Sequence, residues 1–62
     1  MNGYKIMRIK KGLTLKEAAE RSGISETSIG KIERGETSPM VKTLEKMAEA
    51  YGCEIADFFT QA

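Results

Sequence analysis

The chain of 62 residues is divided into short segments by glycines that stand where a helix would end: Gly12, Gly23, Gly35 and Gly52. The segments between them begin with residues that favour a helix start, namely Thr14, Ser25 and the pair Ser38 and Pro39. No segment shows the strict alternation of a β-strand, and the connections are only a few residues long. The pattern therefore predicts an all-α fold, a compact bundle of five helices.

The caps and the apolar spacing bound the five expected helices. Thr14 is expected to cap the second helix, with Glu17 completing a capping box. A hydrophobic staple between Ile24 and Ile29 is expected to fix the start of the third. In chain order, the predicted helices are residues 2–11, 14–22, about 26–34, 38–51 and 55–59.

The composition limits what such a bundle can do. At 62 residues the chain is expected to form a single domain, residues 1–62, with little apolar surface left for a small-molecule pocket. It has no histidine and one cysteine, so neither a zinc site nor a disulfide framework can be assembled within one chain. Without a histidine, a nucleophile beside a base or a phosphate loop, the chain is not expected to be an enzyme or to need a cofactor.

Nothing in the chain resembles a targeting or membrane segment. The N-terminal stretch MNGYKIMRIKKG alternates charged and apolar residues too closely for a signal peptide. No run approaches the roughly 18 apolar residues of a transmembrane helix. A cytoplasmic protein with no membrane partner is therefore expected.

The net charge is only +1, but it is unevenly distributed. Residues 1–34 hold eight Lys and Arg against four Glu, a net charge of +4, whereas residues 35–62 hold two Lys against four Glu and one Asp, a net charge of −3. The first half could face a polyanion while the second faces away from it. The alternative is a chance asymmetry on a small solvated surface.

The stretch SGISETSIGKIERG predicts a helix whose outward side is narrow. At 100° per residue Ile29 and Ile32 point inward, and the outward positions are Thr27, Gly30, Lys31 and Arg34. Such a helix fits a DNA major groove, about 12 Å wide, where its longer polar side chains reach bases or phosphates. The RSGIS turn before it is typical of a helix-turn-helix. An ordinary solvated helix face is the alternative.

The run GLTLKEAAERSGISETSIGKIERGETSP, followed by TLEKMAEAYGCEIADFF, resembles the Cro/repressor type of helix-turn-helix domain, also called the xenobiotic-response-element family. The resemblance covers essentially the whole chain. It implies the lambda repressor-like five-helix bundle of a bacterial or phage protein located at the nucleoid. It also implies a homodimer, at least on DNA, that binds a palindromic double-stranded operator with the third helix in the major groove.

The family's DNA contacts carry over to matching positions of this chain. The start of the third helix and the residue one turn later are implied to touch bases, at Glu26, Thr27, Ser28 and Lys31. The start of the second helix, the end of the third and the loop beyond are implied to touch phosphates, at Thr14, Leu15, Lys16, Arg34, Thr37 and Ser38.

Two of these positions depart from the family's usual residues. Most members have glutamine at the position of Leu15, so this side chain is expected to pack inward or against sugar carbons while backbone amides hold the phosphate. Many members have a basic or amide residue at the position of Glu26, where a carboxylate lowers non-specific affinity. Glu26 either reads the N4 amino group of cytosine or only complements the helix dipole.

Further positions are expected to be structural. In the family, the positions of Arg8 and Glu33 form a salt bridge between the first and third helices. Cys53 stands where the family has a small apolar residue, so a buried, inert thiol is favoured over a redox sensor. The methionines expected in the core are Met7, Met40 and Met47. A small domain has little room for adjacent phenylalanines, so a dimer interface is predicted at Ile55, Phe58 and Phe59.

Two classes of function fit these observations. The first is a sequence-specific regulator of transcription, a repressor, that binds double-stranded DNA. The second is a protein-interaction module that keeps the fold with weak or no DNA binding, which the low net charge would suit. Steeply salt-dependent binding of duplexes would distinguish the first class from the second.

Overall fold

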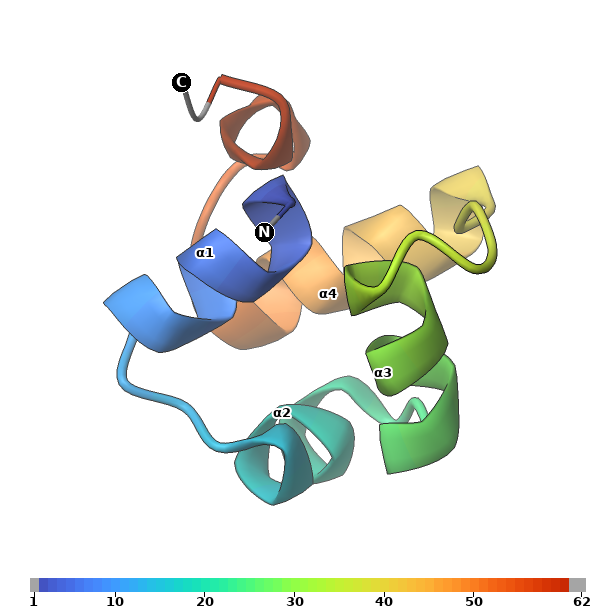
Figure 1. The fold of residues 1–62 in the computed structure, drawn as a ribbon. Helices are drawn as coiled ribbons and strands as arrows, with labels where there is room; N and C mark the ends of the chain where they lie inside the picture. The colour runs from blue at the N-terminus through green and yellow to red at the C-terminus, as the bar shows by residue number, and fades with distance from the viewer. Residues whose placement is uncertain (1, 61–62) are drawn as a thin grey trace.

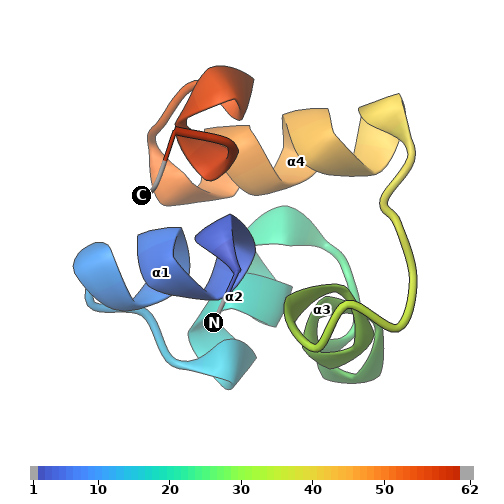
Figure 2. The ribbon, with the colours of Figure 1, turned by 45° about the horizontal axis from the view of Figure 1, so that its top comes forward.

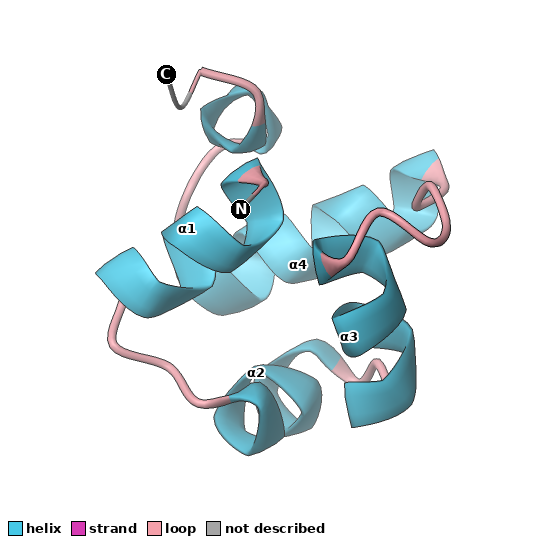
Figure 3. Cartoon of the chain, in the orientation of Figure 1, coloured by secondary structure: helices cyan, strands magenta, loops and turns pink. Residues whose placement is uncertain are grey.

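The computed structural model describes residues 2–60 and contains helices joined by short loops (Figure 1). No strand occurs in residues 2–60, as Figure 3 makes clear, and the predicted all-α class is confirmed. The elements are α1 at Gly3–Lys10, α2 at Leu15–Ser22, α3 at Glu26–Glu33, α4 at Val41–Tyr51, and a 3-10 helix, η1, at Ile55–Phe58.

The predicted caps form the expected local hydrogen bonds. The hydroxyl of Thr14 accepts a hydrogen bond from the amide of Glu17 at 3.0 Å, and the Glu17 carboxylate accepts from the Thr14 amide at 2.9 Å. The hydroxyl of Ser25 accepts from the amide of Ser28 at 3.1 Å. Each cap satisfies an amide of the first helical turn that has no partner within its own helix. The starts of α2 and α3 are thus fixed by local sequence.

Most bounds agree with the prediction to within one residue, but three elements need comment. Asn2 caps α1 instead of joining it, because its side chain accepts from the amide of Lys5. The predicted start of the fourth helix at Ser38 and Pro39 is wrong: Met40 has an extended backbone, with φ −74° and ψ 162°, so α4 begins at Val41. The last element has only four residues, and a segment this short forms 3-10 rather than α-helical turns.

The helices pack around one shared core. α2 contacts both α3 and α4, and η1 contacts α1 and α4. Figure 2 shows α4 lying across the molecule, with η1 folded back over its C-terminal half. Every helix and the loop between α1 and α2 contribute buried side chains, namely Met7, Leu13, Ala18, Ile29, Ile32, Met47, Ala48, Tyr51 and Phe58. The core therefore joins elements from both ends of the chain.

Two core predictions need correction or refinement. Met7 and Met47 are buried as expected, but Met40 is 78% exposed because it lies in the loop before α4, outside the packed face of that helix. Cys53 is partly buried against the core, and desolvation raises the pKa of its thiol. A raised pKa reduces the thiolate fraction at neutral pH, which agrees with an unreactive side chain.

Within residues 2–60, none of the helices combines the length and the apolar character needed to cross a membrane. The same part of the chain contains no group of three or more side chains that could hold a metal ion.

Candidate nucleic-acid interface

The turn between α2 and α3 sets the angle of the third helix. Gly23 adopts a left-handed conformation, with φ 74°, and its amide donates to the carbonyl of Ala19 at 2.9 Å. The next amide, of Ile24, donates to the hydroxyl of Ser22 at 3.2 Å. A side chain with a Cβ rarely tolerates positive φ, so glycine suits this sharp turn. The chain then enters α3 two residues later.

The inner side of α3 is held by the core and by α1. Ile29 is fully buried and Ile32 is 4% exposed. The side-chain amide of Asn2 donates to the carbonyl of Ile32 at 2.8 Å, which joins the start of α1 to the end of α3. The carbonyl of Ile32 also accepts from the amide of Gly35 at 3.1 Å, so Asn2 adds a second hydrogen bond to the last turn of α3.

The predicted salt bridge between α1 and α3 is confirmed. Nε of Arg8 lies 2.7 Å from Oε2 of Glu33, and a second guanidinium nitrogen donates to Oε1 at 3.1 Å. Arg8 also donates to the carbonyl of Leu13 at 2.8 Å, at the start of the loop into α2. One arginine thus ties together α1, the approach to α2, and α3. This arrangement makes α3 a rigid platform for its outer side chains.

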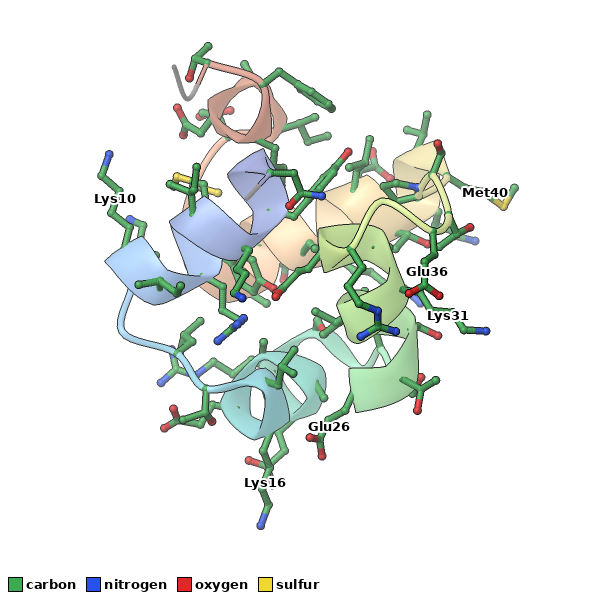
Figure 4. All side chains as sticks on the ribbon, in the orientation of Figure 1. Lys10, Lys16, Glu26, Lys31, Glu36 and Met40 are labelled. Atoms are coloured by element: carbon green, nitrogen blue, oxygen red, sulfur yellow. The ribbon has the colours of Figure 1, made fainter. Side chains whose placement is uncertain are left out.

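The residues predicted to touch bases all lie on the surface of α3. Glu26, Thr27, Ser28 and Lys31 are exposed. In Figure 4, Glu26 projects from the start of α3 and Lys31 projects outward from its side. The hydroxyl of Ser28 accepts a hydrogen bond from the hydroxyl of Ser25 at 2.9 Å, so its position is fixed by the cap. These four side chains therefore bring one cation, one carboxylate and two hydroxyls to the outer face of α3.

The residues predicted to touch phosphates lie at both ends of this face. Thr14 and Lys16 are exposed at the start of α2, and Figure 4 shows Lys16 pointing away from the molecule near Glu26. Leu15 is half-buried and packs against the core, as the sequence suggested for its side chain. Thr37 and Ser38 are exposed in the loop after α3 and border a groove that is also lined by Lys31. Both sets thus border the outer face of α3.

Gly30 does not lie open to solvent as the helical wheel suggested. It is buried, and a Cβ placed there would lie 3.0 Å from Nη1 of Arg34. The guanidinium of Arg34 therefore covers the backbone of α3 at this position. A helical wheel counts directions but does not follow a long side chain along the helix, so it missed this contact.

Glu36 is the residue of this surface that sequence reasoning did not single out. Nε of Arg34 donates to Oε2 of Glu36, and this hydrogen bond lowers the pKa of the Glu36 carboxyl. Lys31 lowers it further through its charge. The available signal was the spacing R-G-E, since a glycine that ends a helix brings the following residue back beside the last turn.

The predicted dimer residues are divided between core and surface. Phe58 is 3% exposed and packs between Tyr4 and Tyr51, with ring centroids 5.1 Å and 5.9 Å away. Its place in the predicted interface is therefore wrong, because its side chain fills the core. Phe59 is 63% exposed and Ile55 is partly buried. As expected, only one of the two adjacent phenylalanines is accommodated inside.

An all-helical bundle with a glycine turn between α2 and a supported, outward-facing α3 defines the helix-turn-helix class of proteins. Comparison with known families agrees: the model of the family described as Helix-turn-helix matches residues 5–58. The chain belongs to this family, of the Cro/repressor type.

The chain is also similar to several regulators of transcription. It is 36% identical to the HTH-type transcriptional regulator PuuR of Escherichia coli (strain K12) over 55 residues, which is 89% of this chain and 30% of PuuR. It is 39% identical over 54 residues to the uncharacterized HTH-type transcriptional regulator y4dJ of Sinorhizobium fredii, covering 87% of this chain and 70% of y4dJ.

A third relative is a phage protein. The cryptic phage CTXphi transcriptional repressor RstR of Vibrio cholerae is 30% identical over 56 residues, which is 90% of this chain and 50% of RstR. The matching region thus spans nearly all of this chain but only about a third of PuuR and half of RstR.

Proposed function

We propose that this chain binds double-stranded DNA in a sequence-specific manner and regulates transcription as a repressor. The observation that carries the proposal is α3 itself, an exposed polar helix held from behind by buried isoleucines and by the Arg8–Glu33 pair. A supported helix with a slim outer face fits the major groove. Membership of the helix-turn-helix family supports the same activity and, with the relatives' names, agrees with the expectation that the chain is not an enzyme.

In this proposal the residues on α3 and those on either side of it make two kinds of contact. Those at the start of α3 and one turn later reach base edges, namely Glu26, Thr27, Ser28 and Lys31. Residues at the start of α2 and in the loop after α3 reach phosphates through hydroxyls, a lysine and backbone amides, namely Thr14, Leu15, Lys16, Thr37 and Ser38. The first N–H groups of a helix point away from its body, so the amides of Leu15 and Lys16 suit a phosphate oxygen.

The size of α3 supports a palindromic operator and a homodimer. A helix of eight residues reads only a few base pairs, so two copies about one helical turn apart, roughly 34 Å, are needed to select a site. Phe59, which is 63% exposed, and Ile55 form the interface between the two copies. Sedimentation on a palindromic duplex tests this arrangement, and one protein chain bound per duplex would contradict it.

Selection of bound sequences from a random duplex pool, at two salt concentrations, tests the function. We expect one enriched sequence and an affinity that falls steeply with salt. Lys31→Ala should relax the preference at one position in each half-site by about 1–3 kcal/mol, whereas Lys10→Ala, on the opposite side of the molecule in Figure 4, should keep the preference. Lack of salt-linked binding would favour a protein-interaction module instead.

The same selection applied to Glu26→Gln separates the two roles of this carboxylate. If Glu26 reads cytosine, the variant loses a cytosine preference in each half-site and binds other duplexes more tightly. If Glu26 only complements the dipole of α3, the preferred sequence stays the same. We favour the cytosine contact because Glu26 projects from the exposed start of α3 (Figure 4).

The proposed site of action is the nucleoid in the bacterial cytoplasm.

A further inference from the structure

The outer face of α3 has a gap at Gly30 that is filled by a side chain from the end of the helix. Arg34 is the C-cap of α3, yet its Nη1 lies 3.0 Å from where a Cβ of Gly30 would stand. The side chain therefore turns back over one helical turn and lies against the helix backbone. By helical angle position 30 lies between Glu26 and Thr27, so the guanidinium stands beside two of the residues proposed to read bases.

Glu36 holds the guanidinium in this place. The carboxylate accepts from Nε of Arg34. Its own position is fixed by backbone hydrogen bonds at the end of α3: the amide of Glu36 donates to the carbonyl of Lys31 at 2.9 Å, and that of Gly35 to Ile32 at 3.1 Å. These two bonds form a Schellman motif, with Gly35 in the left-handed conformation. The carboxylate is therefore anchored to the last turn of the helix.

The guanidinium keeps donors available to a ligand. The Arg34 side chain is 59% exposed, and Glu36 engages only its Nε. Among residues 2–60, neither terminal nitrogen of Arg34 has a hydrogen-bond acceptor. These nitrogens form a planar fork, which matches the O6 and N7 acceptors of guanine in the major groove.

The adjacent carboxylate also argues against a role on the phosphate backbone. A phosphate contact draws its strength from net positive charge and counterion release. The Arg34–Glu36 pair has no net charge, and its carboxylate repels phosphate oxygens. Base reading depends instead on the direction of the donors, which a fixed carboxylate improves by restricting the side chain.

We infer that Arg34 is a specificity-determining residue that reads a guanine from its place over Gly30, with Glu36 as its positioning residue. This inference rests on the proposed DNA-binding function and replaces the phosphate contact expected for Arg34 from the sequence. Gly30 is also required for this guanine contact, because any side chain at position 30 would occupy the place of the Arg34 guanidinium.

The decisive variant is Gly30→Ala, because it leaves every charge of the protein in place. Alanine favours a helix over glycine, so the variant is expected to fold. Its Cβ would displace the flexible end of Arg34. We expect the preference for guanine at one position of each half-site to fall by roughly 5- to 150-fold, the range of a good bidentate contact, while the salt dependence stays the same.

Companion variants separate orientation from charge. Arg34→Lys keeps the charge without the planar fork and should lose the same guanine preference. Glu36→Gln should tighten binding to duplexes that lack the guanine, because a repulsive charge is removed, and so lower the ratio between the two duplexes. Lys10→Ala matches the charge loss of Arg34→Ala at a remote, exposed position of α1 and should leave the guanine preference intact.

The competing outcome is a phosphate contact. If Arg34→Ala weakens all duplexes by the same factor and lowers the slope of log affinity against log salt by about one, with an unchanged preferred sequence, the inference is overturned while the proposed function stands. A wild-type protein that binds no duplex in a salt-dependent manner would overturn both.

Discussion

Two arginine–glutamate pairs border α3, and their surroundings differ sharply. The Arg8–Glu33 pair lies between α1 and α3, where the side chains are 11% and 5% exposed. The Arg34–Glu36 pair lies on the outer face, where they are 59% and 50% exposed. Glu33 and Arg34 are neighbours in the sequence, yet one belongs to the scaffold and the other to the surface. The direction that each side chain takes from the helix separates these roles.

The surroundings also determine how firmly each pair is held. Arg8 makes two hydrogen bonds to Glu33 and one to the carbonyl of Leu13, and the bonds to Glu33 raise the pKa of its guanidinium. In a medium of low dielectric such a pair is costly to open. The exposed pair has one hydrogen bond and is screened by water and salt. A buried pair suits a support, whereas an exposed pair whose guanidinium keeps donors available suits contact with a ligand.

Glu33→Gln should have the largest effect on stability. The substitution leaves the guanidinium of Arg8 buried without its counter-charge, so the free energy of unfolding should fall by about 3–5 kcal/mol. For a chain of this size, most of the total stability would be lost. Urea denaturation followed by far-ultraviolet circular dichroism measures the change, with Glu36→Gln as the matched control on the exposed pair.

A double variant shows whether the loss comes from the unpaired charge. Arg8→Met combined with Glu33→Leu removes both charges and fills the space with apolar side chains, so it should recover most of the stability lost in Glu33→Gln. If the double variant is as unstable as the single one, the hydrogen bond from Arg8 to the carbonyl of Leu13 is the more important contact.

Tyr51→Phe tests whether water reaches the buried hydroxyl of Tyr51. The Tyr51 ring is 3% exposed, and its hydroxyl has no hydrogen-bond partner among residues 2–60. Burial raises the pKa of Tyr51 to about 12, with the charge of Glu33 as the next cause. Removing a buried, unpaired hydroxyl should stabilise the protein by about 1 kcal/mol at pH 7.

The advantage of Tyr51→Phe should grow in alkali. The unfolded state releases the tyrosine proton near pH 10, but the folded state holds it to about pH 12, so the wild type loses stability as pH rises between these values. The phenylalanine variant lacks this loss, which amounts to about 2.7 kcal/mol for two pKa units. Unfolding at pH 7, 10 and 11.5 measures the difference. A constant difference would mean that water reaches the hydroxyl.

The two sides of α3 were not equally predictable from the sequence. The caps at Thr14 and Ser25 and the turn at Gly23 could be predicted because each depends on residues within a few positions. The buried salt bridge came from the family resemblance, since no spacing rule joins residues 25 positions apart. The assignment of the two adjacent phenylalanines needed the structure, because both rings contact Tyr4 and the 3-10 turn of η1 decides which one is buried against Tyr51.

The surface pair needed the structure for a different reason. The place of Arg34 depends on three features together: the missing side chain at Gly30, the turn at Gly35 and the carboxylate of Glu36. Each residue is visible in the sequence, but the direction that the Arg34 side chain takes depends on how the three are arranged in space. A helical wheel treats residue 30 as open and residue 34 as pointing straight out. Arginine is long enough to make both statements wrong.

The smallest expected effect is that of Glu36→Gln on stability. The exposed Arg34–Glu36 pair should change the melting temperature by no more than about a few degrees. The hydrogen bond from Arg34 lowers the pKa of Glu36, so its contribution is present above the pKa of the unfolded carboxyl, about 4.3, and is lost as pH falls through the lower folded-state value. Thermal unfolding of both proteins at pH 7, 4 and 3 measures this.

The difference between wild type and Glu36→Gln should therefore shrink at acidic pH and also in about 1 M salt, where the Debye length is roughly 3 Å. Glu17, whose pKa is lowered by its hydrogen bonds with Thr14, titrates in both proteins, so its effect cancels in the comparison. A difference that persists in high salt would mean that the carboxylate acts through packing against α3 instead of through charge. The contrast between the two pairs would then be one of geometry, with the surface pair as much a part of the scaffold as Arg8 and Glu33.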